Sequence, residues 1–202
     1  MRVFLCDAGN IPQEVLKKAA RALPEARVPK TGIRDDAFAA RVIGTLLAIY
    51  AIKQLSPETV CENWGNTAEG KPFIGGSPIE FSITHAHGLV GVAVSAEHPM
   101  GLDIEEIRPM REGFAARYLS EREQAEIRAA GDPDEALIRL WTAKEAVGKY
   151  HGTGLGGKIA EIDTQSAVSA VFEKSGTRFA LSLAPKATLP PLEWVDFEDL
   201  VP

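Results

Sequence analysis

The chain has 202 residues, of which 45% are hydrophobic, and its 22 basic and 28 acidic residues give a net charge of −6. This composition excludes disordered and fibrous classes, and the negative charge argues against broad attraction to nucleic acid or an anionic membrane. We therefore expect neither as a partner. Cys6 and Cys61 are too few for a disulfide framework, so both are expected to be buried thiols in a reducing, cytoplasmic compartment.

The apolar pattern predicts the elements of the first half in chain order. An apolar run at the amino terminus predicts a strand, and not a signal peptide or membrane span. Apolar residues at helical spacing predict a long helix over 35–53. Strands are expected over 59–64, 79–84 and 90–95, separated by turn-rich segments.

The second half begins with a strand predicted over 101–107. Two short helices are expected between residues 111 and 130, and a long helix over 134–150 is stopped by the glycines that follow it. Strands are then expected over 166–173, 178–183 and 192–197, the last completing the second sheet.

The repeated order of elements predicts an α+β fold of two similar halves. Each half would have a small, mainly antiparallel sheet packed on one long helix. The expected boundaries are 1–100 and 101–202, and a ligand site between the halves is the default expectation.

Two carboxylates, Asp103 and Glu105, alternate along the strand predicted over 101–107. Since alternate residues of a strand share one face, both side chains should point the same way. Magnesium takes hard oxygen ligands and keeps positions for water and substrate phosphates, so the pair is a candidate cation site. The alternative is an exposed strand face with two solvated acids, which this segment alone favours.

The long helix of the second half carries an unusual stripe. Spacings of three and four place Trp141, Lys144, Glu145, Gly148 and Lys149 on roughly one side of it. The glutamate could complete a metal shell, and the two ammonium groups could meet phosphate oxygens. The alternative is an ordinary Glu145–Lys149 pair on a solvated helix, worth about 0.2–0.5 kcal/mol.

The first half offers a further set of polar candidates. Thr84 and His85 end a predicted strand with groups that hydrogen-bond well to phosphate. Lys71 stands in a turn before a proline, and Arg41 lies in the first long helix. Taken singly, each is more typical of the protein surface than of a ligand site.

The order of four motifs resembles the 4′-phosphopantetheinyl transferases. These are Gly70-Lys71-Pro72, Phe-x-x-Thr-His over 81–85, Gly-x-Asp-x-Glu over 101–105 and Trp-x-x-Lys-Glu-x-x-x-Lys over 141–149. The chain is most similar to the large surfactin-synthetase type, in which two similar halves related by a pseudo-twofold form the active site between them. The resemblance implies a monomer that uses coenzyme A and Mg²⁺ to modify a serine of an apo acyl or peptidyl carrier protein, releasing adenosine 3′,5′-bisphosphate.

The resemblance also implies a role for each candidate. Asp103, Glu105 and Glu145 would bind Mg²⁺, and Glu145 is also the candidate general base. Lys149 would contact the reacting phosphate and protonate the leaving oxygen. The expected contacts to coenzyme A are Arg41, Lys71, Thr84, His85, Lys144 and Lys149.

The chain departs from the family pattern at several positions. Ala86 and Ala146 stand where the family commonly has serine, and Lys30 and Arg34 are only weak substitutes for basic residues that some members place ahead of Arg41. The alternatives are a coenzyme A-binding homologue without transfer activity and a Mg²⁺-dependent phosphohydrolase.

Overall fold

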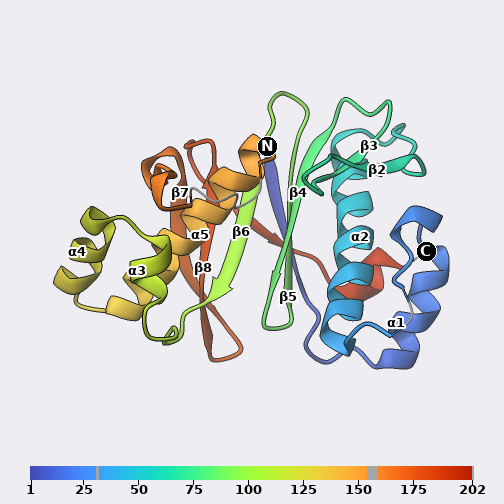
Figure 1. Ribbon diagram of the computed structural model, residues 1–202. Helices are drawn as coiled ribbons and strands as arrows, with labels where there is room; N and C mark the ends of the chain where they lie inside the picture. Colours follow the sequence, from blue (N-terminus) through green and yellow to red (C-terminus); the bar gives the residue numbers. More distant parts are fainter. Residues whose placement is uncertain (31, 154–158, 202) are drawn as a thin grey trace. The chain divides into compact units, whose positions relative to one another are not determined.

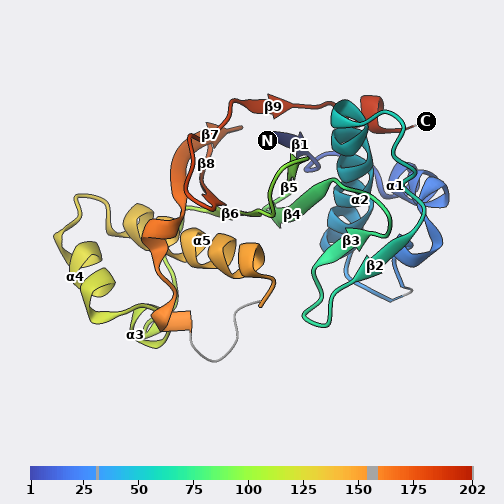
Figure 2. The same ribbon diagram turned by 90° about the horizontal axis from the view of Figure 1, so that it is seen from above.

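The computed structural model describes residues 1–30, 32–153 and 159–201, and it confirms an α+β fold (Figures 1 and 2). The chain forms two compact units. The first unit is Met1–Met100 with Pro190–Pro202, and the second is Gly101–Leu189. The assignment of the last residues to the second half is therefore wrong. β9 (Leu192–Trp194) pairs in parallel with β1 (Arg2–Asp7) of the first unit instead of completing the second sheet.

The first unit is built on a mixed four-stranded sheet that includes β4 (Glu80–Ala86) and β5 (Leu89–Ser95), and its strand order is β4-β5-β1-β9. β5 pairs antiparallel with both β4 and β1. A side-chain clip fixes β9 at the edge, because Arg2 Nε donates to Glu193 Oε1 at 2.8 Å.

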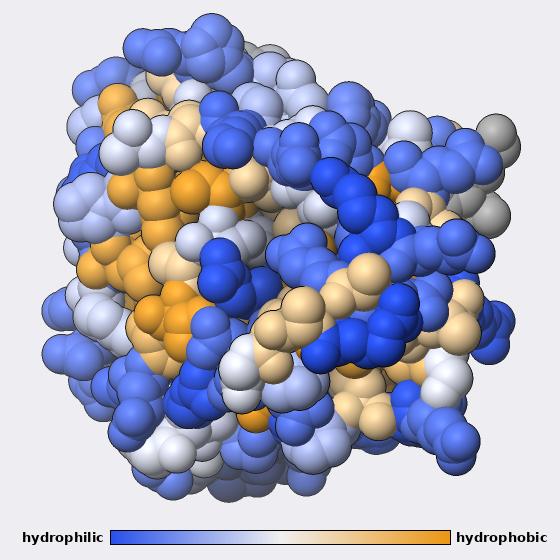
Figure 3. Space-filling view, turned by 90° about the vertical axis from the view of Figure 1, so that its left-hand side faces the viewer, coloured by the Kyte–Doolittle hydropathy of each residue, from blue (hydrophilic) through white to orange (hydrophobic). Residues whose placement is uncertain are grey.

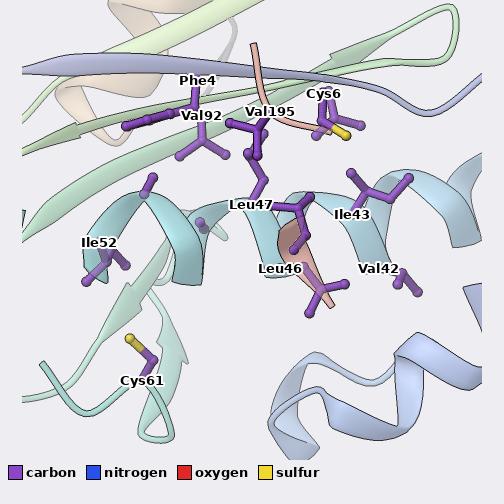
Figure 4. Close-up of a cluster of buried hydrophobic side chains, with 14 of the residues drawn as sticks. Phe4, Cys6, Val42, Ile43, Leu46, Leu47, Ile52, Cys61, Val92 and Val195 are labelled. Carbon is purple, nitrogen blue, oxygen red and sulfur yellow. The ribbon is translucent and has the colours of Figure 1, made fainter. Parts of the chain in front are cut away.

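The long helix α2 (Asp35–Leu55) packs on this sheet and supplies much of the core. Figure 4 shows Ile43 and Leu47 pointing from α2 toward the strands. By length and composition, α2 alone among the helices of the described residues is apolar enough to cross a membrane. Half of that stretch is buried within the structure, so packing in the core accounts for its apolar composition.

The strand predicted over 59–64 is wrong. Residues 58–63 are irregular, because the Trp64 indole Nε1 donates to the Cys61 carbonyl at 2.7 Å and closes a local turn in place of a ladder. Both cysteines are buried free thiols, as expected. The remaining elements of the unit are α1 (Gln13–Ala19), η1 (Ala20–Ala22), η2 (Glu25–Arg27), the hairpin of β2 (Trp64–Asn66) and β3 (Pro72–Ile74), and η5 (Phe197–Leu200).

The second unit has an antiparallel three-stranded sheet in the order β6 (Gly101–Glu106), β8 (Thr177–Ala184) and β7 (Val168–Lys174). Figure 3 faces the left-hand side of Figure 1 and shows apolar residues gathered in one area of that surface, with hydrophilic residues around them. The predicted elements of this unit are confirmed with ends that differ by no more than two residues. They are β6, α3 (Phe114–Tyr118), α4 (Glu121–Ala129), α5 (Pro133–His151), β7 and β8. The structure adds two short helices that were not predicted, η3 (Ile159–Glu161) and η4 (Thr164–Ser166).

Local chemistry sets both ends of α5. Asp132 caps the first turn by accepting from the Glu135 amide at 3.0 Å, and Gly152 ends the helix with a left-handed φ of 68°. The helix approaches β6 closely at Gly101, where an added Cβ would lie 2.0 Å from the Ala146 carbonyl oxygen. Only glycine permits this approach, which brings the last turns of α5 against β6.

Candidate active site

The structure brings the three predicted metal ligands into one electrostatic cluster within the second unit. Asp103 and Glu105 alternate on β6, on the strand face that Gly101 presents to α5, and Glu145 projects from α5. Asp103 is 5% exposed, and Glu105 and Glu145 are partly buried. Within the described residues, neither glutamate makes a hydrogen bond or an ion pair, so their charges are poorly compensated.

Burial and mutual repulsion act together on the two glutamates. Burial raises the pKa of Glu105 to about 7, and the neighbouring Asp103 carboxylate adds to the effect. Burial, followed by repulsion from Asp103 and Glu105, likewise raises the pKa of Glu145 to about 7, against the opposing influence of Lys149. A cation at this cluster would remove the repulsion.

Lys149 lies directly in the carboxylate cluster. Its Nζ donates to Asp103 Oδ1 at 2.7 Å and to the Leu102 carbonyl at 3.0 Å. Lys149 of α5 is therefore hydrogen-bonded to β6. The alternative, in which Lys149 forms a solvated pair with Glu145 on the helix surface, is wrong. This ammonium group is bonded to Asp103 and acts electrostatically on Glu105 and Glu145. It could bind a phosphate that arrives together with a cation.

The carboxylates are not preassembled around a metal position. No group of three His, Cys, Asp or Glu side chains in residues 1–30, 32–153 and 159–201 is close enough to hold an ion. The chemistry of the donor set nevertheless fits magnesium, because all three groups are hard oxygen ligands from two rigid elements. These residues could hold Mg²⁺ only if their side chains moved from the positions seen here.

The structure contradicts the predicted contact between Lys144 and coenzyme A. Lys144 is fully buried and pairs with Glu123 of α4, with 3.0 Å between Nζ and Oε2. Its Nζ also donates to the carbonyls of Ile159, Ala160 and Ile162 at 2.9–3.3 Å. A phosphate could reach this ammonium only by breaking four contacts in the interior, so Lys144 is a structural residue.

Arg41 lies beside a second arginine that the sequence analysis missed. Its guanidinium donates to the carbonyls of Ala26 and Arg27, each at 3.2 Å. Arg27 is only 6% exposed, stacks over the Trp64 ring at 4.8 Å and donates to Thr45 Oγ1 at 3.2 Å. Burial lowers the pKa of Arg27 to about 10, and the charge of Arg41 adds to this. No carboxylate pairs with either arginine in the described part of the chain.

This arrangement makes the two arginines a candidate anion site. A bound anion would offset the cost of burying the Arg27 charge and would reduce the repulsion between the two guanidiniums. The sequence signal for Arg27 was weak. Arg27 precedes Arg41 by 14 residues in the chain, and only the packing of η2 against α2 brings the two together.

The other three predicted contacts to coenzyme A lie in the first unit, each in a different setting. Lys71 Nζ donates to the Met100 carbonyl at 3.2 Å and lies 3.7 Å from Glu80. Thr84 is buried, whereas His85 is exposed and lines a cavity of about 440 Å³ in the first unit. That cavity also contains Arg34, but its guanidinium is already paired with Asp36.

An aromatic cluster of Phe114, Tyr118 and Trp141 accounts for the tryptophan of the helix stripe. The Trp141 ring lies 4.9 Å from Phe114 and 5.4 Å from Tyr118, measured between centroids. Trp141 stands one helical turn before Glu145. The cluster therefore packs α3 against α5 close to the carboxylates.

Comparison with known proteins gives the class of this fold and site. A family model described as the 4′-phosphopantetheinyl transferase superfamily matches residues 99–191, which include all three carboxylates and Lys149. The 4′-phosphopantetheinyl transferase AcpT of Salmonella typhimurium is 33% identical over 168 residues, covering 81% of this chain and 77% of the relative.

Shorter matches extend to other bacteria. A 4′-phosphopantetheinyl transferase of Bacillus subtilis is 29% identical over 126 residues, covering 60% of this chain and 55% of the relative. HetI of Nostoc is 34% identical over 104 residues, covering 48% of this chain and 44% of the relative. The chain belongs to the 4′-phosphopantetheinyl transferase superfamily, and its enzyme class is that of these transferases.

Proposed function

We propose that this protein transfers the 4′-phosphopantetheine arm of coenzyme A to a serine of an apo carrier protein in a Mg²⁺-dependent reaction. The observation that carries the proposal is the cluster of Asp103, Glu105 and Glu145 with Lys149 beside it, inside the stretch that the family model matches. The proposal includes a cytoplasmic monomer of the large type, with two halves related by a pseudo-twofold.

The chemistry needs charge neutralisation and in-line positioning more than covalent help from the enzyme. Magnesium, when bound by the three carboxylates, neutralises charge on the pyrophosphate of coenzyme A. Glu145 accepts the proton of the carrier serine as its oxygen forms a bond to the β-phosphorus. The bond from that phosphorus to the bridging oxygen breaks, and Lys149 Nζ donates a proton to the departing adenosine 3′,5′-bisphosphate.

Incubation with coenzyme A, Mg²⁺ and a panel of apo acyl and peptidyl carriers tests this function by intact mass. We expect at least one carrier to gain one phosphopantetheine, with adenosine 3′,5′-bisphosphate appearing in equal amount. Consumption of coenzyme A without any carrier would favour the phosphohydrolase. Binding of coenzyme A without modification of any carrier would favour the silent homologue.

We further propose that Arg27 and Arg41, with Lys71 and His85, hold the adenosine phosphates. A lost charge-assisted hydrogen bond costs about 1.5–3 kcal/mol. Dephospho-coenzyme A should therefore show a KM raised by roughly 10- to 150-fold, with kcat changed much less. The 3′-phosphate lies away from the reacting bond and serves binding more than chemistry.

The Arg41→Met and Lys71→Met variants identify the residues responsible, because a variant without the contact should no longer discriminate between the two donors. Lys17→Met is a matched control in the same unit, since Lys17 forms an exposed pair with Glu14. Equal KM values for both donors in the wild-type protein would contradict the assignment of a 3′-phosphate contact.

A further inference from the structure

A buried polar clamp joins three elements of the second unit. We use the term clamp for Lys144, Glu123 and the carbonyls of Ile159, Ala160 and Ile162. Glu123 is 2% exposed and belongs to a capping box in which its Oε2 accepts from the Ser120 amide at 2.8 Å. Its Oε1 accepts from Thr164 Oγ1 at 3.1 Å. Every charged atom of the clamp therefore has a directional partner.

The clamp is not needed for stability, because apolar side chains could stabilise these elements as well as a buried ion pair does. A buried ion pair loses hydration on both partners, and apolar residues of similar volume often stabilise a protein equally well. Apolar contacts are non-directional, however, whereas the bonds of the clamp fix both distance and angle. The clamp restricts how α5 can turn about its own axis.

The rotation of α5 matters because Glu145 follows Lys144 directly in the helix. Neighbouring residues are separated by about 100° around an α-helix, and residues four apart share a face. Glu145 and Lys149 therefore turn together, by the same angle as Lys144. On the sheet side, α5 is held by Thr142, whose hydroxyl lies 2.7 Å from that of Ser182, and by the close approach at Gly101.

We propose that Lys144 and Glu123 are positioning residues that set the rotation of α5 and thereby aim Glu145 and Lys149 at the carboxylates of β6. The role rests on the proposed function, and it replaces direct contact between Lys144 and coenzyme A. Lys144 acts on metal binding and on the chemical step, and leaves affinity for the nucleotide end of coenzyme A nearly unchanged.

The test uses the full chain and three variants. Lys144→Met/Glu123→Leu replaces both charges together with apolar groups, which avoids stranding one buried charge. Glu123→Gln is a milder, isosteric change that keeps the fold if the double variant does not. Arg139→Met is the matched control, since Arg139 lies on the same helix in a partly exposed pair with Glu135.

Four quantities are measured for each variant: the unfolding midpoint, the Kd of Mn²⁺ and the Kd of coenzyme A by calorimetry, and kcat with an apo carrier. We expect the double variant to bind Mn²⁺ about 10- to 100-fold more weakly, the range known for changes behind a metal shell. Its kcat should fall about 10- to 100-fold, while its Kd for coenzyme A without metal stays within about threefold. Glu123→Gln should show the same pattern more weakly, and Arg139→Met none of it.

Two results would overturn the clamp as a positioning device. If the double variant bound coenzyme A without metal tenfold more weakly while Glu123→Gln changed nothing, Lys144 would be a ligand contact. If a folded double variant kept normal Mn²⁺ affinity and kcat, the clamp would be purely structural. A wild-type protein that modified no carrier would count against the proposed function instead, and the Mn²⁺ comparison would still decide the clamp.

Discussion

Replacement of Asp103 or Glu145 by alanine is expected to reduce carrier modification by about 10²- to 10⁴-fold. Each change removes one of three proposed oxygen ligands, and the lost charge stabilisation is on the order of several kcal/mol, with every 1.36 kcal/mol worth about tenfold in rate. The fold should persist, because loss of Glu145 removes a repelled carboxylate. The measurement is the initial rate of holo-carrier formation by mass, at saturating coenzyme A and Mg²⁺.

The matched control for this experiment is Glu126→Ala, which removes an exposed glutamate of α4 in the same unit. The unfolding midpoints of all three variants should lie within a few degrees of wild type, so that a lost rate reports on the site. Near-normal turnover of either site variant with Mg²⁺ would show that the carboxylate does not take part in the reaction.

The metal-free protein is expected to lose stability as the pH rises from 5 to 8. The pKa values of Glu105 and Glu145 are raised from 4.5 to about 7 in the folded state. The folded state then binds protons more tightly than the unfolded state. This contribution is present in full below the unfolded pKa and disappears as the pH passes through about 7. After allowance for the partial exposure of both groups, the expected loss is about 3 kcal/mol.

Magnesium should restore most of this loss at pH 8 and little of it at pH 5, because the ion competes with protons for the same oxygens. At about 2–4 °C per kcal/mol, the midpoint at pH 8 should rise by roughly 6–12 °C when Mg²⁺ replaces a chelator. The measurement is the thermal unfolding midpoint at pH 5 and pH 8, each with Mg²⁺ and with a chelator. The Glu145→Gln variant should show a smaller pH dependence, and an equal effect of Mg²⁺ at both pH values would contradict the cluster as its binding place.

Local signals in the sequence were sufficient for most of the secondary structure and for the core of the candidate site. Apolar residues at helical spacing predicted α2 and α5, although α2 is buried on all sides over 42–48. Strand alternation placed Asp103 and Glu105 on one face, and the structure keeps them there. These predictions depend only on the periods of helix and strand, which are properties of neighbouring residues.

Only the tertiary structure shows which elements the predicted helices and strands contact. Periodicity put Lys144 on the same stripe as Glu145, but the packing of α4 and the segment 159–162 covers Lys144 and leaves its neighbour beside β6. Likewise β9 has the composition of a strand, while its pairing with β1 depends on contacts nearly the whole chain apart. The buried Arg27 beside Arg41 has the same origin. The sequence shows which side chains need a hydrogen-bond or ion-pair partner when they are buried, but long-range packing determines which partner each one meets. The reason is that many arrangements bury the same apolar surface, whereas only one satisfies the buried polar groups.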